Sequence, residues 1–94
     1  NIKRIILDVL KPHTPSIIEV AERLANLEGI SGVNVLLDEV DAETDSVKIT
    51  IEGNNINYVE VKKEISDCGA VIHSIDGVSA GMKIIDEVNT PQDR

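Results

Sequence analysis

The sequence contains almost no aromatic residues and few basic ones. Tyr58 is the only aromatic side chain among the 94 residues, and Phe and Trp are absent. Nine Lys and Arg residues stand against seventeen Asp and Glu residues, which gives a net charge of −8 at pH 7. Because this charge repels nucleic-acid phosphates and anionic lipids, we expect neither nucleic acid nor a membrane to be a partner.

Cysteine and long apolar runs are also scarce. Cys68 is the only cysteine, which excludes a disulfide within the chain and a cysteine-based zinc site. No run approaches the roughly 18 consecutive apolar residues of a transmembrane helix, and no charged-then-apolar leader is seen. We therefore predict a cytoplasmic protein with a single domain over residues 1–94.

The apolar residues that are present are mainly β-branched, with fourteen Ile and eleven Val against six Leu. Such side chains favour strands, because their stiff branches pack well on a pleated surface. Alternation of apolar and polar residues predicts strands at 2–10, 33–41, 47–52 and 70–76. Amphipathic stripes predict two helices, the first running from Pro15 to about Leu27 and the second ending at Cys68. Their expected N-caps are Thr14 and Asn57, the latter with Glu60 three residues on.

The order of these elements is strand, helix, strand, strand, helix, strand. Two right-handed crossover units of this kind predict an α+β, ferredoxin-like βαββαβ sandwich with sheet order 4-1-3-2 and both helices on one face. The core of this domain is expected over about residues 2–77. Residues 78–88 form an extra segment, for which a further C-terminal strand is favoured over a helical turn, and 89–94 form a tail.

Charged residues predict the pairing of the first and third strands. Aligning Ile6 with Thr50 in an antiparallel pair places Arg4 opposite Glu52 and Asp8 opposite Lys48, both on the face without helices. The fourth strand is expected to bring Asp76 close to Arg4.

The face without helices also carries aliphatic residues, including Ile6, Leu10, Leu36 and Ile72. Isolated exposed aliphatic residues are common, but an uncovered sheet with unpaired edges can also bind another chain. The extra C-terminal segment has no place in a four-stranded core. We therefore predict self-association into a homo-oligomer, with these candidate interface residues: Ile6, Leu10, Leu36, Met82, Ile84 and Ile85.

Several short strings resemble an archaeal family catalogued as domain of unknown function 211. The resemblance spans about residues 2–87 and is carried by the strings at 7–13, 27–29, 33–34, 47–53 and 71–76. It implies a ferredoxin-like fold, an archaeal cytoplasmic protein and ring-like homo-oligomers. It implies no established activity and no catalytic residues.

The densest local signal is acidic. Five carboxylates fall within eight residues at the end of one strand and its hairpin loop, at Asp38, Glu39, Asp41, Glu43 and Asp45. Ca²⁺ and Mg²⁺ prefer oxygen ligands, so these residues are candidate metal ligands. Residues 47–51 form a strand that cannot wrap around an ion, which excludes an EF-hand. The alternative is a solvated acidic hairpin that prevents aggregation at the sheet edge.

Two further groups admit more than one interpretation. Asp8, Glu52 and Asp76 on the helix-free face are suited to acid–base chemistry or to ion pairing with neighbouring Lys and Arg. His13 follows the first strand, and His73 is expected on the same face as Val71 and Ile75. The two histidines form a metal pair or serve separate structural roles.

These observations predict a non-enzymatic, homo-oligomeric module that binds a divalent cation or a small metabolite at its subunit interfaces. The alternative is a small enzyme that uses carboxylates with His13 or His73 near the end of the sheet. An enzyme needs a concave pocket with convergent polar groups, whereas an assembling module needs flat apolar contacts.

Overall fold

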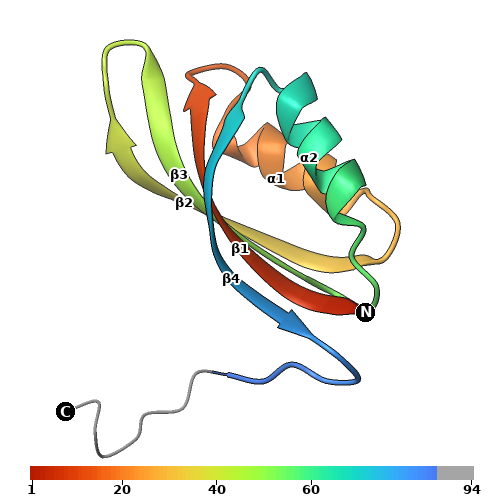
Figure 1. The fold of residues 1–94 in the computed structure, drawn as a ribbon. Coiled ribbons are helices and arrows are strands. Elements are labelled where there is room, and N and C mark those ends of the chain that lie inside the picture. The colour runs from red at the N-terminus through yellow and green to blue at the C-terminus, as the bar shows by residue number, and fades with distance from the viewer. Residues whose placement is uncertain (87–94) are drawn as a thin grey trace, which may run out of the picture.

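A four-stranded antiparallel sheet forms the centre of the molecule, and both helices lie on one of its faces (Figure 1). The computed structural model describes residues 1–86. Its elements are β1 (Ile2–Pro12), α1 (Ile17–Ala25), β2 (Ile30–Val40), β3 (Thr44–Gly53), α2 (Tyr58–Asp67) and β4 (Val71–Ala80). The strands lie in the order β2-β3-β1-β4, which confirms the predicted ferredoxin-like α+β fold.

The core lies between the sheet and the helices. Alternate residues of the two central strands point into it, because side chains along a strand alternate between its faces. The fully buried aliphatic residues of β1 and β3 are Ile5, Leu7, Val9, Val47, Ile49 and Ile51. The helices close this layer with Val20, Leu24, Val61 and Ile65. Burial of these side chains holds the helices to the sheet.

The pairing of β1 with β3 follows the predicted register. Arg4 stands opposite Glu52 and Asp8 opposite Lys48, and Arg4 Nε lies 2.8 Å from Glu52 Oε2. Strand β4 brings Asp76 to a cavity that Arg4 also lines, but the residue of β4 that stands opposite Arg4 is Ser79. Asp76 lies 3.1 Å from Lys48 Nζ.

Strand β4 does not alternate regularly. Its pairing with β1 shifts three times, and two of these shifts leave His73 and Asp76 as extra residues of β4 in β-bulges. Each of these two bulges moves the side chains that follow it along β4 to the other face of the sheet. Ile72 therefore stands opposite Val9 and packs against the core, so its expected place on the open side is wrong.

The two helices begin and end close to the predicted positions. Ser16 rather than Thr14 caps α1, and its side chain accepts a hydrogen bond from the Glu19 amide at 3.2 Å. The predicted cap of α2 is confirmed, because Asn57 accepts from the Glu60 amide. The expected extension of α1 to Leu27 is wrong by two residues. Within residues 1–86, neither helix is long and apolar enough to cross a membrane.

The extra C-terminal segment does not add a fifth strand over residues 81–86. Strand β4 itself continues to Ala80, and the chain then turns at Gly81. The Ile85 amide donates to Ser79 Oγ at 2.9 Å, and Asp86 Oδ1 accepts from Arg4 Nη1 at 2.6 Å. These contacts hold the segment beside one corner of the sheet, near Arg4. The last two residues of the predicted segment and the tail, 87–94, lie outside the described residues.

Candidate functional site

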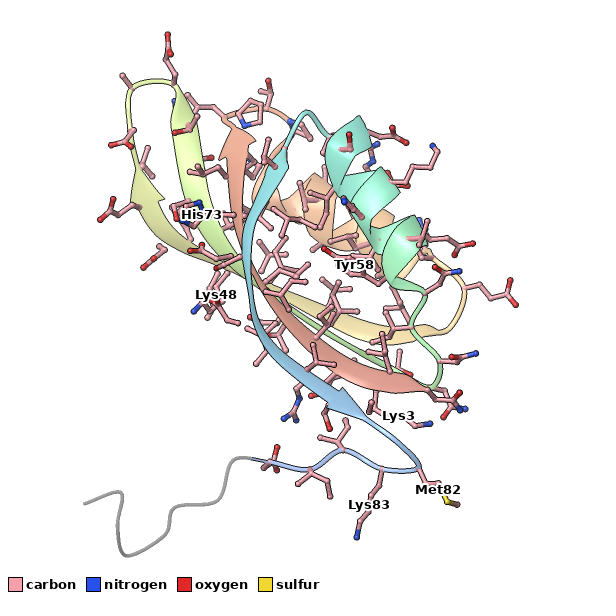
Figure 2. The ribbon with its side chains drawn as sticks, in the orientation of Figure 1. Lys3, Lys48, Tyr58, His73, Met82 and Lys83 are labelled. Atoms are coloured by element: carbon pink, nitrogen blue, oxygen red, sulfur yellow. The ribbon has the colours of Figure 1, made fainter. Side chains whose placement is uncertain are left out.

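The side of the sheet opposite the helices, here called the open face, carries most of the predicted site residues. Figure 2 shows Lys48 and His73 on this side and Tyr58 on the other, between the sheet and the helices. Leu36 is 60% exposed and stands opposite Lys48 in the sheet. Leu10 is also exposed, whereas Ile6 is half-buried beside Gly77.

The C-terminal segment continues this apolar character beyond the sheet. The side chain of Met82 is completely exposed, and that of Ile85 is largely exposed. Ile84 is half-buried. The Arg4 corner of the open face forms a cavity with this segment, which Ile6, Ile85 and Asp86 help to line.

Ion pairs occupy the positions between the aliphatic side chains of the open face. The Ser74 hydroxyl donates to Asp76 at 2.7 Å, and together with the Lys48 ammonium it lowers the pKa of Asp76. The pKa of Lys48 is raised in turn by its hydrogen bond to Asp76. Glu52 is held by Arg4. These contacts support the ion-pairing interpretation of Glu52 and Asp76 over acid–base catalysis.

Four titratable side chains line one cavity at the hairpin end of the open face. Asp8, Glu39, Asp41 and His73 line a cavity of about 230 Å³, with Leu10 and Ser46 completing its wall. The bulge in β4 turns His73 toward this cavity. His73 was expected on the face shared by Val71 and Ile75, but Val71 and Ile75 themselves stand opposite residues of different faces, Leu10 and Leu7.

His13 lies in a separate cluster with Lys11 and Asp45, where β1 ends beside the β2–β3 hairpin. His13 Nδ1 lies 2.8 Å from Asp45 Oδ1, and His13 Nε2 lies 2.9 Å from the Ala42 carbonyl oxygen. Lys11 Nζ donates to Asp45 Oδ2 at 3.1 Å and to the carbonyls of Pro12 and His13 at 2.7 and 3.4 Å. Each histidine therefore has its own surroundings.

The electrostatics of this cluster follow from those contacts. The Ala42 carbonyl and then the Asp45 carboxylate raise the pKa of His13, because both accept from its protonated ring. His13 and then Lys11 lower the pKa of Asp45, despite its partial burial. Asp45 is thus an ionised carboxylate whose two oxygens both have partners.

Lys11 was not among the predicted site residues, although the sequence contained a signal for it. Lys11 continues the alternation of Ile5, Leu7 and Val9 on the helix side of β1, and its side chain is only 1% exposed. Extending the predicted β1–β3 register places Lys11 opposite Asp45. A lysine on the apolar face of a central strand needs a buried partner. The register of β1 with β3 identifies Asp45 as that partner.

The predicted metal ligands are distributed over the hairpin. Glu39 and Asp41 line the cavity with His73, whereas Asp45 is engaged by Lys11 and His13. Asp38 is the extra residue of a bulge in β2, and Glu43 lies in the exposed turn. Among residues 1–86, no three His, Cys, Asp or Glu side chains form a group that could hold a metal ion. The cation site stays a prediction.

Cys68 caps the end of α2 and is buried. Burial raises the pKa of its thiol, which favours the protonated form over the nucleophilic thiolate. This environment is typical of a small core residue.

Comparison with known proteins identifies the family. A family model of DUF211, described as "Uncharacterized ArCR", matches residues 3–94. The chain belongs to the DUF211 family. It is also similar to the uncharacterised protein MJ0319 of Methanocaldococcus jannaschii, with 55% identity over 94 residues that cover all of this chain and 97% of that protein. The resemblance inferred from the short strings is therefore confirmed, while the ring-like assembly that it implied stays a prediction.

Proposed function

We propose that this DUF211 protein is a non-enzymatic module that assembles with copies of itself through the open face of its sheet. One observation supports this proposal above the others: Leu36 and Leu10 are exposed on a sheet face that neither helix covers. Exposed aliphatic residues that recur on one face are typical of protein interfaces when charged residues surround them. Here the surrounding charges are already paired, as Arg4 with Glu52 and Lys48 with Asp76.

The edges of the sheet support the same proposal. On β4, Val71, Ile75 and Val78 are exposed, and on β2, Leu37 and Val40 are exposed. Both outer strands therefore combine apolar side chains with backbone groups that no further strand of residues 1–86 pairs. Long apolar edges of this kind promote association unless another chain or segment covers them.

Light scattering on Leu36→Glu tests the assembly. We expect the wild-type protein to have a mass of two or more chains of 10.2 kDa each. Leu36→Glu is expected to shift it toward the single chain, because a carboxylate buried in an interface loses its hydration. Ile18→Glu is the matched control, since Ile18 is equally apolar and 70% exposed but lies on α1. A wild-type mass of one chain would refute the proposal, as would an equal loss of mass in the control.

The proposal includes a divalent cation or small metabolite bound between subunits. Glu39 and Asp41 support it, because they share the open-face cavity with Asp8 and His73. Carboxylates from two subunits could together reach the six to eight oxygen ligands that Ca²⁺ prefers. Asp45 has no free oxygen for such a role.

Calcium is expected to raise the melting temperature of the protein, because a ligand that binds only the folded state stabilises it. The double variant Glu39→Gln, Asp41→Asn removes two carboxylates from the cavity and should abolish the rise. Glu22→Gln with Glu60→Gln removes the same charge from the helices and should keep it. No rise at millimolar calcium, or an equal rise in both double variants, would contradict the cation site.

A further inference from the structure

The contacts of His13 tie two separate parts of the chain together. His13 lies just after β1, while its partners Asp45 and Ala42 belong to the start of β3 and to the turn before it. Figure 1 shows the end of β1 beside this hairpin, in agreement with the pairing of Pro12 with Thr44. The imidazole ring therefore bridges the strand end and the hairpin.

The bridge requires a particular protonation state. Both groups that face the ring are acceptors: the Asp45 carboxylate and the Ala42 carbonyl oxygen. A neutral imidazole carries one N–H and can satisfy only one of them, whereas the imidazolium donates to both. Loss of the proton therefore places a nitrogen lone pair against an oxygen lone pair at one end of the bridge.

Lys11 fixes the position of the Asp45 carboxylate. Its ammonium binds the second oxygen of Asp45, so the carboxylate keeps its orientation when the histidine changes charge. The charged groups that face His13 are Asp45 from β3, which favours the imidazolium, and Lys11 from β1, which opposes it. His13 is 45% exposed, so protons can exchange with solvent, while Asp45 is only 13% exposed.

We propose that the His13 imidazolium is a pH-sensitive clasp, which holds the turn between β2 and β3 to the end of β1 and loosens this turn on losing its proton. The hairpin turn carries Asp41 and Glu43, so the clasp controls where these carboxylates lie. This inference depends only on contacts within one chain and holds whether or not the protein assembles.

The sign of the pH dependence follows from the contacts. Because folding raises the pKa of His13, its stabilising contribution is complete below the pKa of the unfolded chain, about 6.5. The contribution is lost as the pH rises through the higher pKa of the folded state. Asp45, whose pKa is lowered, stays ionised throughout this range.

Nuclear magnetic resonance on the whole chain tests the clasp between about pH 5 and 9. The ring nitrogens of His13 report its protonation, and the Asp41 amide reports the hairpin, because it donates to the Thr44 carbonyl at 2.8 Å. We expect the protection of this amide, corrected for intrinsic exchange, to fall about fivefold, as for one lost hydrogen bond. Its midpoint should coincide with that of His13, while the Ile56 amide, bonded to Ile2 at the opposite end of the sheet, stays protected.

Two variants complete the experiment. His13→Gln has no titrating ring and should make the protection of the Asp41 amide independent of pH. His73→Gln removes the other histidine and should leave the wild-type transition unchanged. The proposal is overturned if the hairpin amide does not respond while His13 titrates, if His13→Gln keeps the transition, or if His73→Gln removes it.

Discussion

Leu7→Ala is expected to lower the free energy of unfolding by about 2–5 kcal/mol, the usual effect of emptying a fully buried leucine site. Leu7 has no exposed surface and lies on the central strand β1, opposite Ile49 of β3 and Ile75 of β4. Strands paired with β1 on both sides hinder the backbone from collapsing into the space left by the side chain. A domain of this size has only about 5–15 kcal/mol of stability, so the variant approaches global unfolding.

Urea denaturation at a fixed protein concentration measures this effect, because association would otherwise contribute to the apparent stability. Ile18→Ala removes an aliphatic side chain of equal size that is 70% exposed on α1. It should change the unfolding free energy by no more than about 0.5 kcal/mol. A loss below about 1 kcal/mol for Leu7→Ala would show that Leu7 is not a central core residue.

Sequence reasoning predicted the fold well where regular alternation continued without interruption. In β1 and β3, each odd-numbered aliphatic residue is buried and the even-numbered charged residues lie on the opposite face, half-buried or exposed. A single alignment therefore gave the faces and the register together. The opposite-charge pair of Arg4 and Glu52 then follows from geometry alone. Asn57 was equally recognisable, because an N-cap side chain acts only on its own helix turn.

Alternation failed in β4, because a bulge depends on the partner strand as well as on the sequence. His73 and Asp76 each add a residue opposite a continuous stretch of β1, and no local residue type marks these positions. The faces assigned to Ile72 and His73 were therefore wrong. The prediction of an extra strand was wrong for a related reason, because residues 81–86 have no partner strand within the described chain. The segment instead forms hydrogen bonds with Ser79 and Arg4.

The sequence predicted which residues make up the candidate site, but not which of them contact one another. The acidic hairpin was evident from the sequence, but its five carboxylates could not be distinguished from one another as candidate metal ligands. The structure separates them, because Asp45 lies opposite a buried lysine whereas Glu39 and Asp41 face the open side. Such a distinction requires the register of β1 with β3 to be extended to the strand ends, where His13 also finds its two acceptors.

Gly53→Ala is expected to destabilise the protein by about 3 kcal/mol, at the upper end of the range for overpacking. Gly53 ends β3 opposite Ile30, where two backbones approach closely. A Cβ atom at this position would overlap the Gly29 carbonyl oxygen and lie 3.0 Å from the Ile30 Cα. These are backbone atoms, so no side-chain rotation relieves the overlap.

The surrounding contacts prevent the backbone from moving aside. Gly29 has a φ of +85°, a conformation that favours glycine, and its carbonyl accepts from the Asn54 amide at 3.0 Å. Relief of the overlap therefore breaks either this hydrogen bond or the pairing of β2 with β3. Gly32→Ala is the matched control, because Gly32 lies on the adjacent strand and a Cβ there has no atom within 4 Å.

Denaturation of the two glycine variants separates steric overlap from chain entropy. Alanine restricts the unfolded chain in both, which stabilises the native state by about 0.4–1 kcal/mol where the conformation is compatible. Gly32→Ala should show this gain or no change, whereas Gly53→Ala should show the loss. Equal stabilities would mean that β2 and β3 separate freely at this end.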